Sequence, residues 1–167
     1  MGVLYLFSVW LHILAATTWL GGMLFLVLVI VPALRRGDRT TAAALMRDSG
    51  RRFRTVGWTC FGLLVCTGAA NLWFRGVRFS HLFDPAWRAT SFGGVLWAKL
   101  VVFALVLLLS AVHDFVLGPR ASQALSRVPP GPEAERLRRA ASILGRFTAF
   151  LALLLFALAV VLVRGVP

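Results

Sequence analysis

Residues 3–34 read VLYLFSVWLHILAATTWLGGMLFLVLVIVPAL, a stretch of 32 residues without Asp, Glu, Lys or Arg. A helix rises about 1.5 Å per residue, so about 20 apolar residues cross the roughly 30 Å hydrocarbon core of a bilayer. Lipid offers no water to backbone N–H and C=O groups, and the stretch is therefore predicted to be helical. It has no basic start and exceeds the apolar core of a signal peptide, so we expect a retained membrane helix.

Three more apolar runs follow this one along the chain. With 59% hydrophobic residues, the 167-residue chain has too little polar surface for a water-soluble domain of its size. We predict a single domain over 1–167, an all-α membrane protein built as a four-helix bundle, with transmembrane helices at about 4–34, 55–74, 93–117 and 147–163. A short interfacial helix is expected over 40–47, and Gly118-Pro119 is expected to end the third transmembrane helix.

Arginine determines the predicted orientation. The net charge is +12, and segments 35–54 and 120–146 carry seven and six Arg, against three in 75–91 and one in the C-terminal tail. Because positively charged loops stay in the cytoplasm, both termini and 75–91 are predicted on the outer side of the inner membrane. Basic clusters between apolar runs indicate an anionic lipid surface as the partner and argue against nucleic acid.

Ionisable side chains inside a membrane span are costly and mark candidate functional sites. The predicted orientation places His12 and Lys99 in the outer half of the membrane. It places His113 and Asp114 near the inner end, about 21 Å from Lys99 along the helix axis. We therefore predict an outer site of His12 and Lys99, with His81 from the loop as a further ligand. His113 and Asp114 would form a secondary inner site.

Structural roles are also open to these residues. Lys99 has a long stem that can reach the outer interface, and His81 lies in a loop where water can solvate it. His113 and Asp114 can hydrogen-bond locally and pair with loop arginines. His12 lies deeper, and Trp19, seven residues further on, shares its helix face. This position favours a functional role for His12.

The side chains fit two kinds of metal chemistry. Cupric ion and haem iron accept imidazole, whereas cuprous ion prefers thiolates and thioethers. Sulfur is sparse, and its five carriers are Met1, Met23, Met46, Cys60 and Cys66. A bis-histidine haem needs both rings at one depth, which disfavours His12 with His113. Haem ligation by His12 with Lys99 or with His81 stays open.

The segment Leu11–Gly22, LHILAATTWLGG, resembles the first helix of the copper-resistance protein D (CopD) family, in which a His precedes Trp-x-Gly-Gly. Further similar elements are Arg52-Phe53, Thr67-Gly68, Lys99 and Gly118-Pro119-Arg120. The resemblance implies a non-enzymatic inner-membrane protein for copper uptake or tolerance. Copper would bind an outer-leaflet site at His12 supported by Trp19, Gly21 and Gly22. A periplasmic copper carrier is the implied partner.

The His12 and Lys99 pattern is also similar to HemJ-type protoporphyrinogen oxidases, small four-helix membrane proteins thought to hold haem b between a His and a Lys. This second resemblance implies an alternative: a haem-b protein for electron transfer or porphyrinogen oxidation, with His12 and Lys99 or His81 at the haem. The acidic segment that follows the first helix in that family is replaced here by an Arg-rich one with Ala42, Ala43 and Ala44. A third hypothesis is a scaffold subunit whose ionisable residues serve packing alone.

Overall fold

The computed structural model describes residues 2–32, 39–125 and 131–165, and these residues are largely helical, with no strand among them. Four helices in the described part are long and apolar enough to cross a membrane, namely Val3–Ile30, Asp48–Phe74, Ser91–Ala121 and Pro132–Arg164. The predicted all-α membrane fold is confirmed. The structure falls into two units, Met1–His81 and Leu82–Pro167. Their assembly into one four-helix domain stays a prediction.

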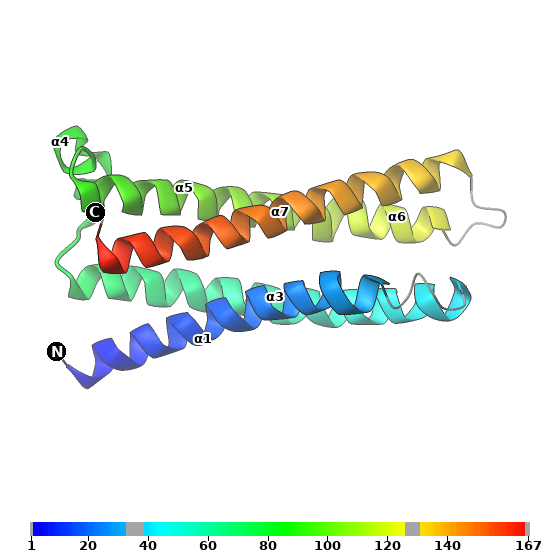
Figure 1. Ribbon diagram of the computed structural model, residues 1–167, viewed down its shortest axis with the longest axis horizontal. Helices are drawn as coiled ribbons and strands as arrows, with labels where there is room; N and C mark the ends of the chain where they lie inside the picture. Colours follow the sequence, from blue (N-terminus) through cyan, green and yellow to red (C-terminus); the bar gives the residue numbers. More distant parts are fainter. Residues whose placement is uncertain (1, 33–38, 126–130, 166–167) are drawn as a thin grey trace. The chain divides into compact units, whose positions relative to one another are not determined.

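The first unit is an antiparallel pair of helices. Helix α1 (Val3–Phe25) continues into a π-helical segment, η1 (Leu26–Ile30), and α1 packs along α3 (Arg39–Phe74), as Figure 1 shows. Residues spaced three and four apart are buried on each helix, as expected for two helices that share a long seam. They are Ser8, Ala15, Trp19 and Met23 on α1, and Cys60, Leu64 and Thr67 on α3.

In the second unit, one long continuous helix packs against α7 (Pro132–Arg164). This long helix consists of α5 (Ser91–Ala111), the π-helical segment η3 (Val112–Leu117) and α6 (Gly118–Leu125), and each of these parts contacts α7 (Figure 1). Val106 of α5 and Ala152 of α7 have no exposed surface at all. Burial of these small side chains indicates close contact between the two helices.

Two short helices, η2 (Phe79–Phe83) and α4 (Pro85–Arg88), occupy the predicted second loop. Gly76 follows α3 with a φ of 78°, a left-handed conformation that ends helices and favours glycine. Asp84 caps α4 by accepting the Ala86 N–H, and Thr90 caps α5 in the same way. These caps fix where the third transmembrane helix begins.

Two segments predicted as loops are largely helical. Helix α3 begins at Arg39, so the separate interfacial helix predicted over 40–47 is part of α3. The acids and arginines over 133–143 also predict a helical start there, and α7 does begin at Pro132 and continue into the span predicted from Phe147. With 36 and 33 residues, α3 and α7 measure about 54 and 50 Å, more than the roughly 30 Å hydrocarbon core. Both helices are therefore longer than the hydrocarbon core is thick.

Ion pairs stabilise these two helices. Arg52 Nε lies 3.0 Å from Asp48 Oδ2, four residues earlier on α3. Glu135, in the first turn of α7, lies 2.9 Å from both Arg138 and Arg139. Exposed pairs at this spacing each contribute only a few tenths of a kcal/mol, roughly, but they favour the helical state.

The prediction that Gly118-Pro119 ends the third transmembrane helix is wrong. Proline lacks an N–H, and its ring collides with the carbonyl four residues earlier in a regular helix. The turn before Pro119 is widened instead, because the Gly118 N–H donates to His113 O, five residues back. Segment η1 has the same relation to Pro32 on the first helix. The wide turn at η3 lets the helix continue past its proline.

Gly118 provides a test of this wide turn. A Cβ at Gly118 would lie 3.1 Å from His113 O, a backbone atom that cannot move freely. We expect Gly118→Ala to destabilise the protein by about 1 kcal/mol, measured by thermal unfolding in detergent. Gly145→Ala on α7 is the matched control, because a Cβ there meets nothing within 4 Å and helix propensity favours Ala by up to about 1 kcal/mol. Equal stabilisation by both changes would contradict the steric role of Gly118.

Candidate functional site

His12 is half-buried on α1 and faces α3. Its Nδ1 lies 2.8 Å from Thr67 Oγ1. The Thr67 hydroxyl also lies within hydrogen-bonding reach of Leu63 O one turn back, and when it donates there, its oxygen accepts from a protonated Nδ1 of His12. A neutral imidazole protonated on Nδ1 has its lone pair on Nε2. The hydrogen bonds thus prepare Nε2 as a metal ligand or proton acceptor.

Other polar groups lie along the seam beside this hydrogen bond. Ser8, one turn before His12, donates to Thr67 O at 3.4 Å. Asn71 lies one turn beyond Thr67 on α3, and its Oδ1 is buried without a hydrogen-bond partner among the described residues. Gly68 lies directly beside the imidazole, where a Cβ would be in van der Waals contact with His12 Cε1 at 3.5 Å. We call Ser8, His12, Thr67 and Asn71 the His12 polar cluster.

The residues predicted to support the His12 site lie on two different faces of α1. Trp19 is 5% exposed, and its ring centre lies 4.9 Å from that of Phe61 on α3. Gly22 also faces α3, where a Cβ would come within 2.6 Å of the Phe53 ring. Gly21 is exposed, with open space around it. Trp19 and Gly22 therefore help to set the register of α1 against α3, and Gly21 does not.

The two other predicted outer ligands, His81 and Lys99, belong to other elements of the chain. His81 belongs to η2, and its Nδ1 accepts the backbone N–H of Arg78 at 2.9 Å. A neutral His81 ring therefore has its proton on Nε2. Lys99 is half-buried on α5 in the second unit. A meeting of either side chain with His12 stays a prediction.

His113 and Asp114 form a pair within η3 of the second unit. His113 Nδ1 lies 3.0 Å from Asp114 Oδ1, and the two side chains are 38% and 23% exposed. This contact is the local hydrogen bond that the sequence allowed for these two side chains. In the part of the chain that the structure describes, no three His, Cys, Asp or Glu side chains are grouped to hold a metal ion.

Sulfur contributes little to a common site. Cys60 is a buried free thiol in the α1–α3 seam, and Cys66 is a free thiol on the exposed face of α3. Met23 is buried on α1, eleven residues beyond His12 and thus about 16 Å further along the helix axis. Met23 and Cys60, the buried sulfur-containing residues among those whose side chains the structure describes, therefore belong to the same seam as the His12 polar cluster.

Comparison with known proteins identifies the family. The model of the family described as Copper resistance protein D matches residues 47–162, which is more than half of the chain. The chain belongs to this CopD family. The predicted family is thus confirmed, and the matched region includes Thr67, Lys99 and His113, whereas His12 lies before it.

Two relatives match most of this chain. An uncharacterized protein of Aquifex aeolicus (strain VF5) is 34% identical over 122 residues, which cover 72% of this chain and 73% of that protein. The copper transport protein CutJ of Bacillus subtilis (strain 168) is 29% identical over 117 residues, which cover 70% of this chain. The match spans only 20% of CutJ. No solved structure matches the chain.

Sequence reasoning did not identify the partners of His12. Hydroxyl and amide side chains are common in membrane helices and carry no charge, so Ser8, Thr67 and Asn71 do not stand out singly. One signal does exist in the sequence. Ser8 and His12 are four apart near one end of a span, and Thr67 and Asn71 are four apart near the end of the next. Two antiparallel helices bring such pairs to the same depth.

The tautomer of His12 can be measured directly. Thr67→Val removes the acceptor of the Nδ1 proton and nearly preserves side-chain shape. We expect 15N NMR of labelled histidine in the reconstituted protein to show protonated Nδ1 at His12, and a shift toward the Nε2-protonated form in Thr67→Val. Thr148→Val is the control, because the Thr148 hydroxyl donates to Leu144 O in the same way without touching a histidine. An unchanged His12 signal in Thr67→Val would contradict the assigned network.

Proposed function

We propose that this protein handles copper in the inner membrane and binds the ion transiently at Nε2 of His12. The observation that supports this function best is the hydrogen bond between His12 Nδ1 and Thr67 Oγ1. Metal-binding histidines commonly donate their other N–H to an oriented acceptor in this way. Cupric ion accepts imidazole nitrogen, and the names of both the family and CutJ refer to copper.

The composition of the cluster favours exchange of copper over storage. Beside the single imidazole of His12 it offers only hydroxyl and amide groups, from Ser8, Thr67 and Asn71. Such neutral oxygen ligands bind copper more weakly than imidazole or sulfur. An ion at His12 would therefore keep ligands from the molecule that delivers it, and we propose a periplasmic copper carrier for that role. Met23 and Cys60 are the softer groups further along the seam that would suit cuprous ion.

A haem-b protein is the alternative function, and it would use the same nitrogen of His12. Haem iron also accepts a neutral imidazole. Lys99 or His81 would supply the second ligand. Under this alternative, the protein would be a haem-dependent membrane oxidoreductase.

One preparation separates these functions. The protein is purified in detergent from cells supplied with copper and haem, and its metal content and visible spectrum are recorded before and after dithionite. We expect copper added to the purified protein to saturate at about one ion per chain, with no Soret band, and we expect this binding to be lost in His12→Ala. Thr67→Val should weaken copper affinity by about 10- to 100-fold, the effect typical of lost orienting partners. His113→Ala is the control and should retain copper.

Other outcomes would contradict the copper proposal. A Soret band that disappears in His12→Ala would establish the haem alternative, and absence of both signals would favour the scaffold role. Steric variants sharpen the test for copper. Gly68→Val places methyl groups beside the imidazole and should reduce copper binding, whereas Gly62→Val, at a position with nothing within 4 Å, should not.

We also propose that both termini and the second loop lie on the outer side, as the Arg distribution predicts. Single cysteines would be introduced at the exposed positions Ser80 and Gly50, in a background with Cys60 and Cys66 replaced by Ala. We expect a membrane-impermeant maleimide to label Ser80→Cys in intact spheroplasts of the expression host. Gly50→Cys should react only after the membrane is permeabilised. The reverse labelling pattern would invert the orientation and place His12 in the inner leaflet.

A further inference from the structure

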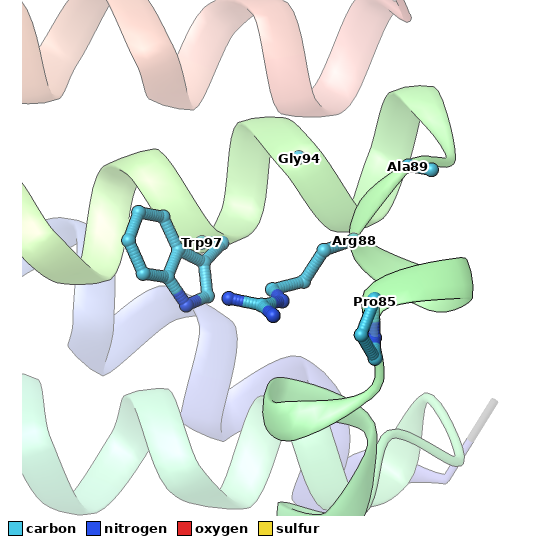
Figure 2. A pocket seen from close by; sticks show the side chains of 5 residues that line it. All are labelled: Pro85, Arg88, Ala89, Gly94 and Trp97. Atoms are coloured by element: carbon cyan, nitrogen blue, oxygen red, sulfur yellow. The ribbon is translucent and has the colours of Figure 1, made fainter.

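A pocket of about 310 Å³ opens at the start of α5, within the second unit. Pro85, Arg88 and Ala89 line it from α4 and the residue that follows, and Gly94 and Trp97 line it from the first two turns of α5 (Figure 2). None of these residues belongs to the His12 polar cluster or to the pair of His113 and Asp114. We call this cavity the Arg88–Trp97 pocket.

Arg88 gives the pocket its charge. Figure 2 shows its side chain extended toward Trp97, and the guanidinium carbon lies 5.6 Å from the centre of a Trp97 ring. Arg88 Nε is buried and has no hydrogen-bond partner among the described residues. A buried N–H without an acceptor is costly, so this atom favours an oxygen acceptor in the pocket. Because a guanidinium carries its charge at all accessible pH values, an anionic oxygen suits it best.

Arg78 provides an internal comparison. Its guanidinium carbon also lies over a tryptophan, 3.9 Å from the centre of a Trp73 ring. Arg78 Nη1, however, donates to Trp73 O at 3.0 Å, and the hydrogen-bonding capacity of this side chain is used locally. Both arginines thus lie over a tryptophan ring. They differ in that the buried Nε of Arg88 has no hydrogen-bond partner among the described residues, and Arg88 lines a cavity.

The surroundings of the pocket indicate a lipid. The apolar span Ser91–Ala121 begins beside it, so the pocket lies where this helix enters the bilayer. Trp97 is 41% exposed, and tryptophan is enriched at the interface between headgroups and acyl chains. Pro85, Ala89 and the Trp97 ring offer apolar surface to a glycerol backbone. Arg88 alone among the lining residues carries a charge, which complements one phosphate group.

We propose that the Arg88–Trp97 pocket binds the phosphate of an anionic phospholipid. The planar guanidinium donates parallel hydrogen bonds to two oxygens of a phosphate, an arrangement that a point charge cannot reproduce. The apolar lining contacts the glycerol and the first carbons of the acyl chains. The bound lipid would hold the α4–α5 corner at a fixed depth in the membrane interface.

Native mass spectrometry tests the proposal with the full-length protein in detergent and phosphatidylglycerol as the probe. We expect one phosphatidylglycerol to bind the wild type at least about tenfold more tightly than Arg88→Gln, as loss of a charge-assisted contact implies. Arg88→Lys keeps the charge without the planar fork and should give an intermediate affinity. Arg78→Gln is the matched control and should stay within about twofold of the wild type.

Each remaining outcome would overturn the assignment. Equal binding of phosphatidylcholine and phosphatidylglycerol would exclude recognition of an anionic headgroup. Competition by millimolar inorganic phosphate would indicate a site for a free anion in place of lipid. Equal loss of affinity in Arg78→Gln and Arg88→Gln would indicate general attraction between the basic chain and the lipid. If Arg88→Gln fails to fold, Arg88→Lys and Trp97→Phe carry the test, and wild-type affinity in both would exclude the pocket.

Discussion

The hydrocarbon core offers no water to backbone N–H and C=O groups, and this constraint shapes each described span of the chain. A span must stay helical from one interface to the other, even where the sequence carries a proline. At Pro119 the helix meets this requirement by widening, so that the Gly118 N–H reaches His113 O. The same adjustment directly precedes Val31 and Pro32 on the first helix. Because η3 contains His113 and Asp114, this ionisable pair lies where the helix is irregular, a feature common at functional sites.

Hydropathy alone predicted the four spans correctly, because apolar length is a direct consequence of membrane thickness. It could not place the starts of α3 and α7. The residues after Arg39 and Pro132 are polar enough to leave the membrane, and their helicity depends on Ala-rich composition and on local ion pairs such as Arg52 with Asp48. The expectation that Gly118-Pro119 ends the helix failed for a related reason. It applies to helices whose ends can be exposed to water, whereas this helix continues past Leu117 to Leu125.

His12 could be selected from the sequence because an ionisable side chain in a span is rare. Its partners depend on the register of α1 against α3, which is a property of tertiary packing. The contact of Trp19 with Phe61 and the close approach at Gly22 set that register, and they bring His12 beside Thr67. The resemblance to the CopD family drew attention to Thr67-Gly68 as a motif. The structure gives both residues of the motif a contact with His12: Thr67 Oγ1 shares a hydrogen bond with Nδ1, and Gly68 lies beside the imidazole ring.

The two units each retain a polar atom at a cost. Asn71 Oδ1 in the first and Arg88 Nε in the second are buried without a hydrogen-bond partner in the described part of the chain. A buried polar atom without a hydrogen-bond partner has lost its contact with water and gained nothing in return, which costs free energy. Sequences tend to break packing rules where function requires it. One of these atoms lies one turn from Thr67, which holds the proposed copper ligand, and the other lines the proposed lipid pocket. A partner that binds from outside the chain is the simplest physical reason to keep either atom polar.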